Sequence, residues 1–365
     1  MTLPRCKRCG LPRRLSERYL WPGNGAIISR HDPGMRMVFF EADYYPYVWH
    51  ELEQRLGVVI SETYIRGQKA SAFDYLGENI LYGWRGLVLR RLPFSFLLNK
   101  VVDELAFFGF GHLELLEYRR HKVVLLRISN PFDIISLAWG TKGFCALVDG
   151  VAMEVAWTKE GEDYLITATP PEGGTEEEPD LEALRALRRA KKELSAIAGS
   201  FPGHETPLPA CPRCRIPSAL TSLEWKEKEG CIVLVPEEKR IVFSSGHVML
   251  GVLRELERIT GTELEQVLLE ITKNYHIEHM EDLRGKERSA VYRELAGRLQ
   301  SWGYGVPLSM GFGVGHLELA IGNPFFPPRL VGLVAAVFEG LEGQEAVVRQ
   351  RMTGPHVLDL QISTL

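Results

Sequence analysis

A cysteine motif that occurs twice constrains the fold of this chain more than any other feature. Cys6 and Cys9 form a Cys-x2-Cys pair near the start of the 365 residues, and Cys211 and Cys214 form a second pair 205 positions later. Such a turn points two thiolates at one metal ion, whereas a structural zinc ion takes four ligands. Two distant segments must therefore meet if both pairs bind the same ion.

Other segments recur at a similar spacing, which indicates an internal duplication. RMVFF resembles RIVFS 204 positions later, Gly-Phe-Gly resembles Gly-Tyr-Gly 194 positions later, and Asn-Pro-Phe recurs 193 positions later. These segments are 36–40 and 240–244, 109–111 and 303–305, and 130–132 and 323–325. A spacing that shrinks in small steps is typical of two repeats that have diverged. The identical HLEL segments at 112–115 and 316–319 do not fit this alignment, and we treat their identity as a coincidence.

A change in composition separates the two halves. Residues 169–179 read TPPEGGTEEEP, which cannot bury apolar surface and is typical of a solvated linker. Asp180 follows as the candidate N-cap of a helix whose leucines recur at helical spacing as far as Gly199. We predict a first repeat over 1–168, an acidic linker and connector helix over 169–207, and a second repeat over 208–365.

Both halves have the same predicted order of elements. A β-hairpin follows the cysteine pair, and then come helices that end at a glycine, a helix leading into Gly-aromatic-Gly, a long hairpin, a helix rich in small residues and a closing strand. The predicted hairpin strands are 26–29 with 37–40, 232–235 with 241–243, and 112–118 with 123–129; the helices include 47–56 and 248–259; the closing strands are 164–168 and 357–362. This order predicts an α+β fold with antiparallel sheets, segregated helices and an N-terminal zinc knuckle in each repeat.

Composition and charge exclude several classes of protein. The net charge is −4, so no overall field draws the chain to nucleic acid. The longest apolar run, Leu330–Phe338, is too short to span a bilayer, and the N-terminus lacks the apolar run of a signal peptide. Six cysteines are too few for a disulfide framework in a chain of this length. We therefore expect a cytoplasmic protein that binds neither membranes nor nucleic acid.

The segment GFGHLELLEYRRHKVVLLRISNPF, with the helix before it and the small-residue helix and strand after it, resembles the 4-vinyl reductase domain. The resemblance covers residues 75–168 and, more weakly, 285–363. It implies the fold that this domain shares with haem-NO-binding sensor domains and transport-particle subunits. It also implies a small hydrophobic or aromatic ligand, a role as a sensor or adaptor, and assembly with a partner or as a homodimer. Some members of the family are vinyl reductases that act on tetrapyrroles.

The chain departs from that family at one point. Members of the family carry cysteines around the last hairpin, where some of them hold zinc. Here the corresponding segments are 154–164 and 346–358, and neither contains a cysteine. A zinc site of the family's kind is therefore missing, and the cysteine pairs stand instead at the start of each half.

The four cysteines predict a structural zinc ion shared between the halves. Cys6, Cys9, Cys211 and Cys214 together supply the four thiolates of a closed tetrahedral site. Two alternatives stay open at this point: separate or intermolecular metal sites, with a further ligand such as His31 or Cys231, and redox or free thiols. The remaining two cysteines, Cys145 and Cys231, are interpreted as packing residues.

Aromatic residues concentrate in the first half, where they predict a cavity for an apolar ligand. The candidate ligand-binding residues are Phe94, Phe96, Phe107, Phe110 and Trp139. Core packing is the competing explanation for each of them. His276 and His279 could bind a metal from one helical face, but their spacing is not that of a metalloprotease helix, and we interpret them as surface residues.

No set of titratable residues with separate catalytic roles can be assembled from the sequence. The leading hypothesis is therefore a non-enzymatic protein, stabilised by zinc, that binds a small hydrophobic molecule or acts as a sensor or adaptor. The alternative is an enzyme similar to vinyl reductases, acting on a tetrapyrrole or another planar substrate. The identity of the ligand does not follow from these residues.

Overall fold

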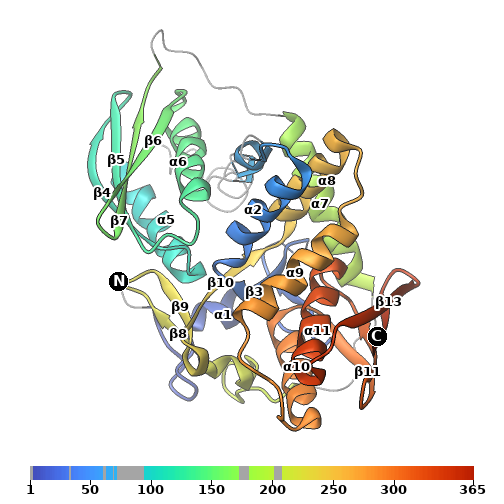
Figure 1. Cartoon of the computed structure of the whole chain (residues 1–365). Helices are drawn as coiled ribbons and strands as arrows, with labels where there is room; N and C mark the ends of the chain where they lie inside the picture. Colours follow the sequence, from blue (N-terminus) through green and yellow to red (C-terminus); the bar gives the residue numbers. More distant parts are fainter. Residues whose placement is uncertain are drawn as a thin grey trace.

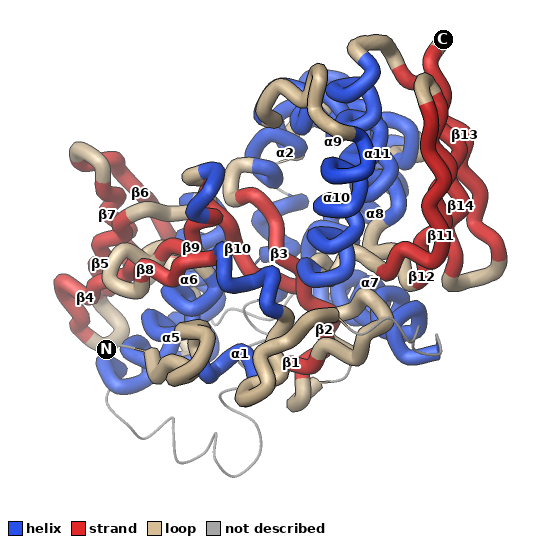
Figure 2. The backbone as a smooth tube through the Cα atoms, turned by 90° about the horizontal axis from the view of Figure 1, so that it is seen from below, coloured by secondary structure: helices blue, strands red, loops and turns tan. Residues whose placement is uncertain are grey.

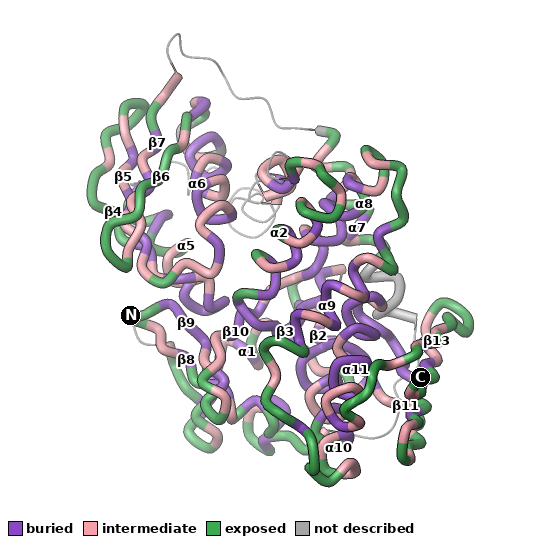
Figure 3. The backbone as a smooth tube through the Cα atoms, in the orientation of Figure 1, coloured by how far each residue is buried: buried purple, intermediate pink, exposed green. Residues whose placement is uncertain are grey.

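The computed structural model describes residues 3–32, 34–60, 63–68, 70–71, 94–171, 181–200 and 208–365. Within these residues the chain forms three antiparallel sheets with helices packed around them (Figure 1). The predicted α+β class and the antiparallel pairing are therefore confirmed. Figure 3 shows buried residues along the central strands and the helices beside them, whereas β6 at the edge of one outer sheet is largely exposed.

The central sheet is built from both halves of the chain. Its six strands lie in the order β1-β2-β3-β10-β9-β8, and β3 pairs with β10 in the middle. The strands are β1 (Tyr19–Leu20), β2 (Ile27–Ser29), β3 (Arg36–Glu41), β8 (Leu223–Lys226), β9 (Cys231–Leu234) and β10 (Lys239–Ser245). Phe39 and Phe243 are cross-strand partners, and their stacked rings are 4.3 Å apart between centroids. Aromatic pairing across the β3–β10 boundary thus joins the halves at the centre of the core.

Two four-stranded sheets lie on opposite sides of the central sheet (Figure 1). One has the order β4-β5-β7-β6 and the other has the order β11-β12-β14-β13. Their strands are β4 (His112–Arg119), β5 (Val123–Ser129), β6 (Glu154–Glu160), β7 (Asp163–Thr169), β11 (Val306–Gly313), β12 (His316–Gly322), β13 (Ala346–Thr353) and β14 (Val357–Thr364). Every pairing is antiparallel. In each sheet the second strand along the chain pairs with the first and with the fourth, and the third strand pairs with the fourth at the edge.

The helices fill the space between these sheets. They are α1 (Arg13–Arg18), α2 (Tyr44–Leu56), α5 (Phe94–Phe108), α6 (Ile134–Asp149), α7 (Leu181–Ser200), α8 (His247–Thr260), α9 (Glu265–His279), α10 (Arg288–Trp302) and α11 (Pro327–Glu342), with short 3₁₀ turns at Ser218–Ser222 and Val235–Glu237. Figure 2 shows α10 and α11 between the central strand β3 and the outer sheet of β11–β14. Gly57 and Gly261 end α2 and α8 in the left-handed conformation, as the sequence predicted.

Two arginines, one buried and one partly buried, connect each half to the other. Arg36 of β3 and Arg240 of β10 stand 204 positions apart, and each donates hydrogen bonds to backbone carbonyls of the opposite half. The acceptors are Gly303 and Asn323 for Arg36, and Gly109, Asn130 and Pro131 for Arg240. The Gly-aromatic-Gly and Asn-Pro-Phe segments of one half are thereby fastened to a central strand of the other.

Two tryptophans also donate hydrogen bonds from one half to the other: Trp225 lies in β8, and Trp21 directly follows β1. The indole N–H of Trp225 donates to the carbonyl of Phe107 at 3.0 Å, and the indole N–H of Trp21 donates to the carbonyl of Ser301 at 3.0 Å. Phe107 and Ser301 are separated by the 194 positions that separate the Gly-aromatic-Gly segments. These contacts therefore follow the spacing of the recurring sequence segments.

The predicted hairpins, helices and closing strands that fall on described residues occur within a few residues of their predicted ends. α2 begins at Tyr44, three residues before the predicted start, and the connector helix α7 covers Leu181–Ser200. The two HLEL segments lie in different strands: His112 begins the first strand of its hairpin, and His316 begins the second strand of the other. The predicted N-cap Asp180 lies outside the described residues.

Candidate metal centre and ligand cavities

The four predicted cysteines come together in one cluster. The sulfur atoms of Cys6, Cys9, Cys211 and Cys214 all lie within 4.8 Å of one another. The Sγ–Sγ distance is 4.0 Å between Cys6 and Cys211 and 3.5 Å between Cys9 and Cys214. A tetrahedral zinc ion with Zn–S bonds of about 2.3 Å separates its sulfur ligands by about 3.8 Å. Four thiolates at this spacing are close enough to hold one metal ion, and their separation is compatible with a tetrahedral zinc site.

Each cysteine pair is shaped by the same tight turn. The carbonyl of Cys6 accepts from the N–H of Gly10 at 2.9 Å, and the carbonyl of Cys211 accepts from the N–H of Arg215 at 2.8 Å. Gly10 and Arg215 both have positive φ, 77° and 64°. This turn brings the second cysteine of each pair back beside the first, so that both sulfurs face one point.

Backbone groups favour the thiolate form of the first cysteine in each pair. The N–H groups of Cys9 and Arg8 lower the pKa of the Cys6 thiol to about 6. The N–H groups of Cys214 and Arg213 likewise lower the pKa of Cys211. Burial raises the pKa of Cys9 and raises that of Cys214 to about 12. Because zinc binds thiolates, the turns stabilise two of the ligands in advance, and metal binding must displace the protons of the other two.

Polar contacts hold the first cysteine turn against the second half. Arg5 donates to the carbonyl of Trp225 at 2.9 Å and forms an ion pair with Glu227 at 2.9 Å. Glu227 also accepts from the backbone N–H of Leu3 at 2.6 Å. The N-terminal segment is thereby fixed along β8, which places Cys6 and Cys9 beside their partners.

Among the described residues, the cysteine cluster is the only group of three or more cysteine, histidine or acidic side chains close enough to hold a metal ion. His31 and Cys231, the further ligands that separate sites would require, do not belong to it. The thiol of Cys231 donates to the carbonyl of Glu229 at 3.4 Å instead. This geometry favours the site shared between the halves over separate sites.

A cavity of about 200 Å³ lies between the first outer sheet and the central sheet. Its wall is mainly apolar and comes from α5, β4, β5 and α6, together with β10 and the start of α8. Two of the predicted ligand residues, Phe94 and Phe110, line it. The ring of Phe94 stacks on that of Tyr118 at 3.9 Å between centroids, which fixes the position of this wall.

The other three predicted ligand residues lie elsewhere. Phe96 is 46% exposed on the outer side of α5, with the ammonium of Lys100 5.3 Å from its ring centre. Phe107 is fully buried in the core, where its ring packs against Tyr19. Trp139 is partly buried beside Lys142 and does not line the cavity. The structure therefore brings Phe94 and Phe110 together at the cavity and leaves Phe96, Phe107 and Trp139 outside it.

Several residues that line the cavity were not predicted. Met35 and Met37 come from the first hairpin, and Phe243, His247 and Val248 come from the second half. The pairing of β3 with β10 places them there, because it brings the second half against the wall that α5 and α6 form. A ligand in this cavity would consequently contact both halves of the chain.

A second cavity, of about 120 Å³, has a similar place in the other half. It lies beside α10 and α11, as the first cavity lies beside α5 and α6. Leu333 is the seventh residue of α11 and Gly140 is the seventh residue of α6, and each lines its own cavity. Charged side chains line the second cavity as well as apolar ones, and the buried imidazole of His276 is among them.

The buried position of His276 predicts a pH dependence of stability. Burial lowers its pKa to about 4, against the opposing effect of Glu41, while Arg329, Lys239 and Arg298 lower it further. A histidine in an unfolded chain titrates near pH 6.5, so between these values the unfolded state binds more protons. The free energy of unfolding should therefore fall as pH decreases from about 6.5 to about 4, by up to about 3 kcal/mol from this group.

Replacement of this histidine provides the test. The variant His276→Leu should show a smaller loss of unfolding free energy between pH 7 and pH 4.5 than the wild-type protein does, as measured by urea denaturation at both values. An identical loss in the two proteins would contradict this prediction, because the pKa of His276 would then not be lowered in the folded state.

Comparison with family models, curated proteins and solved structures finds no match to this chain. No helix among the described residues is both long and apolar enough to cross a membrane. The functional assignment is therefore carried by the cysteine cluster and by the two cavities.

Proposed function

We propose that this chain is a non-enzymatic binding protein in which a zinc ion joins the two halves and a small apolar molecule occupies the first cavity. The observation that carries this proposal is the mainly apolar cavity of about 200 Å³ that residues of both halves line. Pockets of this kind, lined by aromatic and aliphatic residues with a few polar groups, are the usual form of small-molecule sites. The polar groups at the wall include Ser136, Thr141 and His247.

The size and lining of the cavity indicate the class of ligand. A cavity of about 150 Å³ lined by leucine, isoleucine and phenylalanine holds a benzene molecule. The first cavity is larger and is bordered by the rings of Phe94, Phe108 and Phe110. A neutral molecule of one or two aromatic rings, or an aliphatic molecule of similar volume, fits these dimensions. Binding would stabilise the arrangement in which β10 of the second half closes the wall, and this coupling is what a sensor or adaptor requires.

We also propose that the two halves are diverged copies of one unit similar to the 4-vinyl reductase domain. The exchanged contacts of Arg36 and Arg240, and those of Trp21 and Trp225, support this proposal because they follow the recurring sequence segments. Equal lengths of corresponding helices also support it: α5 and α10 both have 15 residues, and α6 and α11 both have 16. In such a pair, the zinc ion would lie where the two cysteine turns meet.

The variant Gly140→Leu tests ligand binding directly. Gly140 lies within α6 and lines the cavity, and an added Cβ there meets no described atom within 4 Å. A leucine should therefore fill the cavity, and it should also favour the helix by about 1 kcal/mol relative to glycine. We expect the wild-type protein to bind naphthalene, detected by the change in its fluorescence, and the variant to bind it at least tenfold more weakly.

A matched control separates cavity filling from the general effect of replacing a helical glycine. Gly297 lies within α10, meets no described atom within 4 Å of an added Cβ, and lines neither cavity. Gly297→Leu should therefore bind naphthalene as the wild-type protein does. Equal binding by Gly140→Leu and the wild type, or no binding by either, would contradict the proposed ligand site.

A further inference from the structure

The second cavity differs from the first in carrying a buried arginine. Arg329 is the third residue of α11, where the third residue of α6 is Ser136, and each of the two lines its cavity. Arg329 is only 2% exposed. An arginine that is buried to this extent loses its hydration, so its N–H groups need partners within the protein or from a ligand.

Aromatic rings surround the guanidinium of Arg329. Its central carbon lies 3.9 Å from the ring centre of Tyr44 and 5.1 Å from the ring centres of Phe40 and Tyr304. Stacking of this kind occupies the faces of the guanidinium and leaves its N–H edges available for hydrogen bonds. The aromatic rings thus hold the guanidinium in one position through contacts with its flat faces.

The hydrogen-bonding capacity of Arg329 is only partly used. One terminal nitrogen, Nη2, bonds a carboxylate oxygen of Glu41 at 3.4 Å, whereas Nε and Nη1 have no hydrogen-bond partner among the described residues. The Nε2 atom of His276, another buried residue of the cavity wall, also has no partner among them. Both side chains therefore offer polar atoms at the cavity that the described protein does not satisfy.

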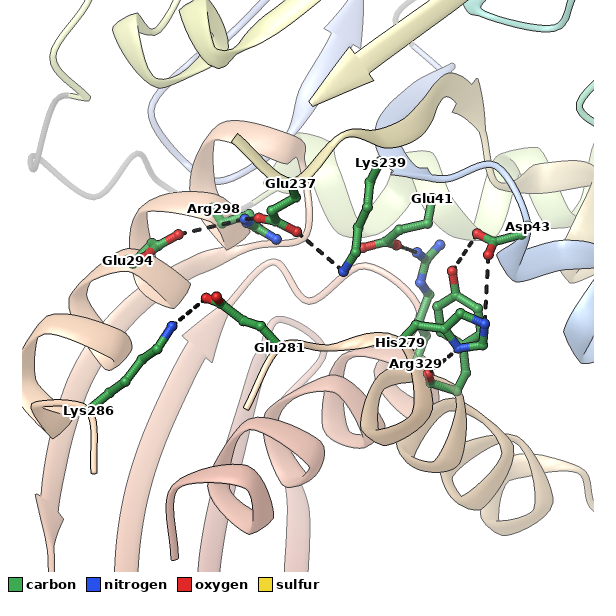
Figure 4. Close-up of polar contacts among 11 residues, drawn as sticks. Glu41, Asp43, Glu237, Lys239, His279, Glu281, Lys286, Glu294, Arg298 and Arg329 are labelled. Carbon is green, nitrogen blue, oxygen red and sulfur yellow. Dashed lines mark hydrogen bonds and ion pairs between the residues drawn. The ribbon is translucent and has the colours of Figure 1, made fainter. Parts of the chain in front are cut away.

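The other charges of the cavity are engaged with one another. Glu237 forms ion pairs with Arg298 and with Lys239, and Lys286 pairs with Glu281 at 2.6 Å. Figure 4 shows these pairs, together with the pair between Glu41 and Arg329, arranged around one region. Among the described cations of this wall, Arg329 is the buried one, and two of its nitrogens have no partner there, so an anionic group is the partner that suits it best.

Apart from His276 and from Glu294, which pairs with Arg298 at 3.6 Å, the rest of the wall is mainly apolar. Leu295, Leu333 and Val337 line the same cavity, together with Met280 and Leu283. Its volume of about 120 Å³ is below that of the cavity of about 150 Å³ that holds benzene, so its ligand should be a short aliphatic molecule with its headgroup directed at the arginine. The site thus combines a buried arginine, paired with Glu41, with a small apolar chamber.

From this arrangement we propose that the second cavity binds a small carboxylic acid, with its carboxylate hydrogen-bonded to Nε or Nη1 of Arg329 and its apolar part against Leu333 and Val337. This site goes beyond the function proposed above, because it is a different cavity with a different ligand class. The chain then has two corresponding sites, one for a neutral apolar molecule and one for an anionic molecule. Either site could exist without the other.

Calorimetric titration of the full-length, metal-loaded protein with butyrate and with the neutral butyramide tests the proposal. We expect the wild-type protein to bind butyrate at least tenfold more tightly than butyramide. Arg329→Met should remove this preference for the anion. Leu333→Trp, which fills the apolar chamber and keeps the arginine, should weaken butyrate binding at least tenfold even if the arginine variant does not fold.

The variant of the first cavity is the control. Gly140→Leu should bind butyrate as the wild-type protein does, because it changes the other cavity. The proposal is overturned if the wild-type protein binds neither compound or binds both equally. It is also overturned if Leu333→Trp binds butyrate with unchanged affinity, because the anion then sits elsewhere on the protein.

Discussion

Replacing Cys211 by serine is expected to abolish zinc binding and to destabilise the whole protein. The remaining three thiolates cannot complete the tetrahedral site, and structural zinc sites contribute on the order of 10 kcal/mol in small metal-binding peptides. In this chain the site joins residues 205 positions apart, so its loss also frees the N-terminal segment. We expect zinc to fall from one ion to less than one tenth of an ion per chain. The unfolding free energy should fall by at least about 3 kcal/mol.

Elemental analysis and thermal unfolding of the purified variant measure these effects. Cys231→Ser is the matched control, since Cys231 is also buried but lies outside the cluster and donates to the carbonyl of Glu229, as serine can. This control should keep one zinc ion and nearly all of the stability. If Cys211→Ser retained a full zinc ion, the shared four-cysteine site would be wrong.

Replacing Gly230 by alanine is also expected to cause a large loss of stability. Gly230 has φ of 66°, and a Cβ at this position would overlap the backbone carbonyl carbon of Gly111 in the other half. Gly25 meets Gly305 in the same way, so close backbone approach occurs at both corresponding places. Because backbone on both sides must move, we expect Gly230→Ala to cost more than about 4 kcal/mol or to prevent folding.

Gly261→Ala separates this overlap from the cost of the left-handed conformation itself. Gly261 has the same φ of 66°, but an added Cβ there meets no described atom within 4 Å. It should cost only about 1–2 kcal/mol, the ordinary penalty of a left-handed alanine. Chemical denaturation of both variants measures the difference. Equal losses in the two variants would show that the halves do not approach each other closely at Gly230.

Local signals in the sequence predicted most of the individual elements. The alternating strands, the glycines that end α2 and α8, and the two cysteine turns depend on residues that are neighbours in the chain. The meeting of the cysteine pairs was predicted by counting ligands, because two thiolates leave a zinc ion incomplete. These inferences needed no knowledge of long-range packing.

The pairing of β3 with β10 could not be predicted in this way. Either strand has the pattern of a buried strand, and nothing in that pattern says which other strand lies beside it. The first cavity depends on this pairing, because Met37 and Phe243 reach its wall only through the central sheet. The sequence consequently predicted Phe94 and Phe110 of its lining and none of the residues that the second half contributes.

Helical spacing could have improved the choice of ligand residues. Phe94, Leu98 and Val101 lie on one face of α5 and line the cavity, while Phe96 is two positions from Phe94 and points to solvent.

The sequence also contained a signal for Arg329 that was not used. This arginine is the one charged residue among the first twelve of the apolar helix α11. A charge in such a helix must have partners in the core, and this is the kind of position where a ligand site is expected.

The most direct test of the account is native mass spectrometry of the wild-type chain, with elemental analysis of the same sample. We expect one zinc ion per chain, together with an additional bound organic molecule that is absent from the Gly140→Leu variant. This result would establish both the shared metal site and the apolar ligand. Two metal ions or none per chain would contradict the zinc site, and a neutral apolar molecule retained by Gly140→Leu would contradict the ligand cavity.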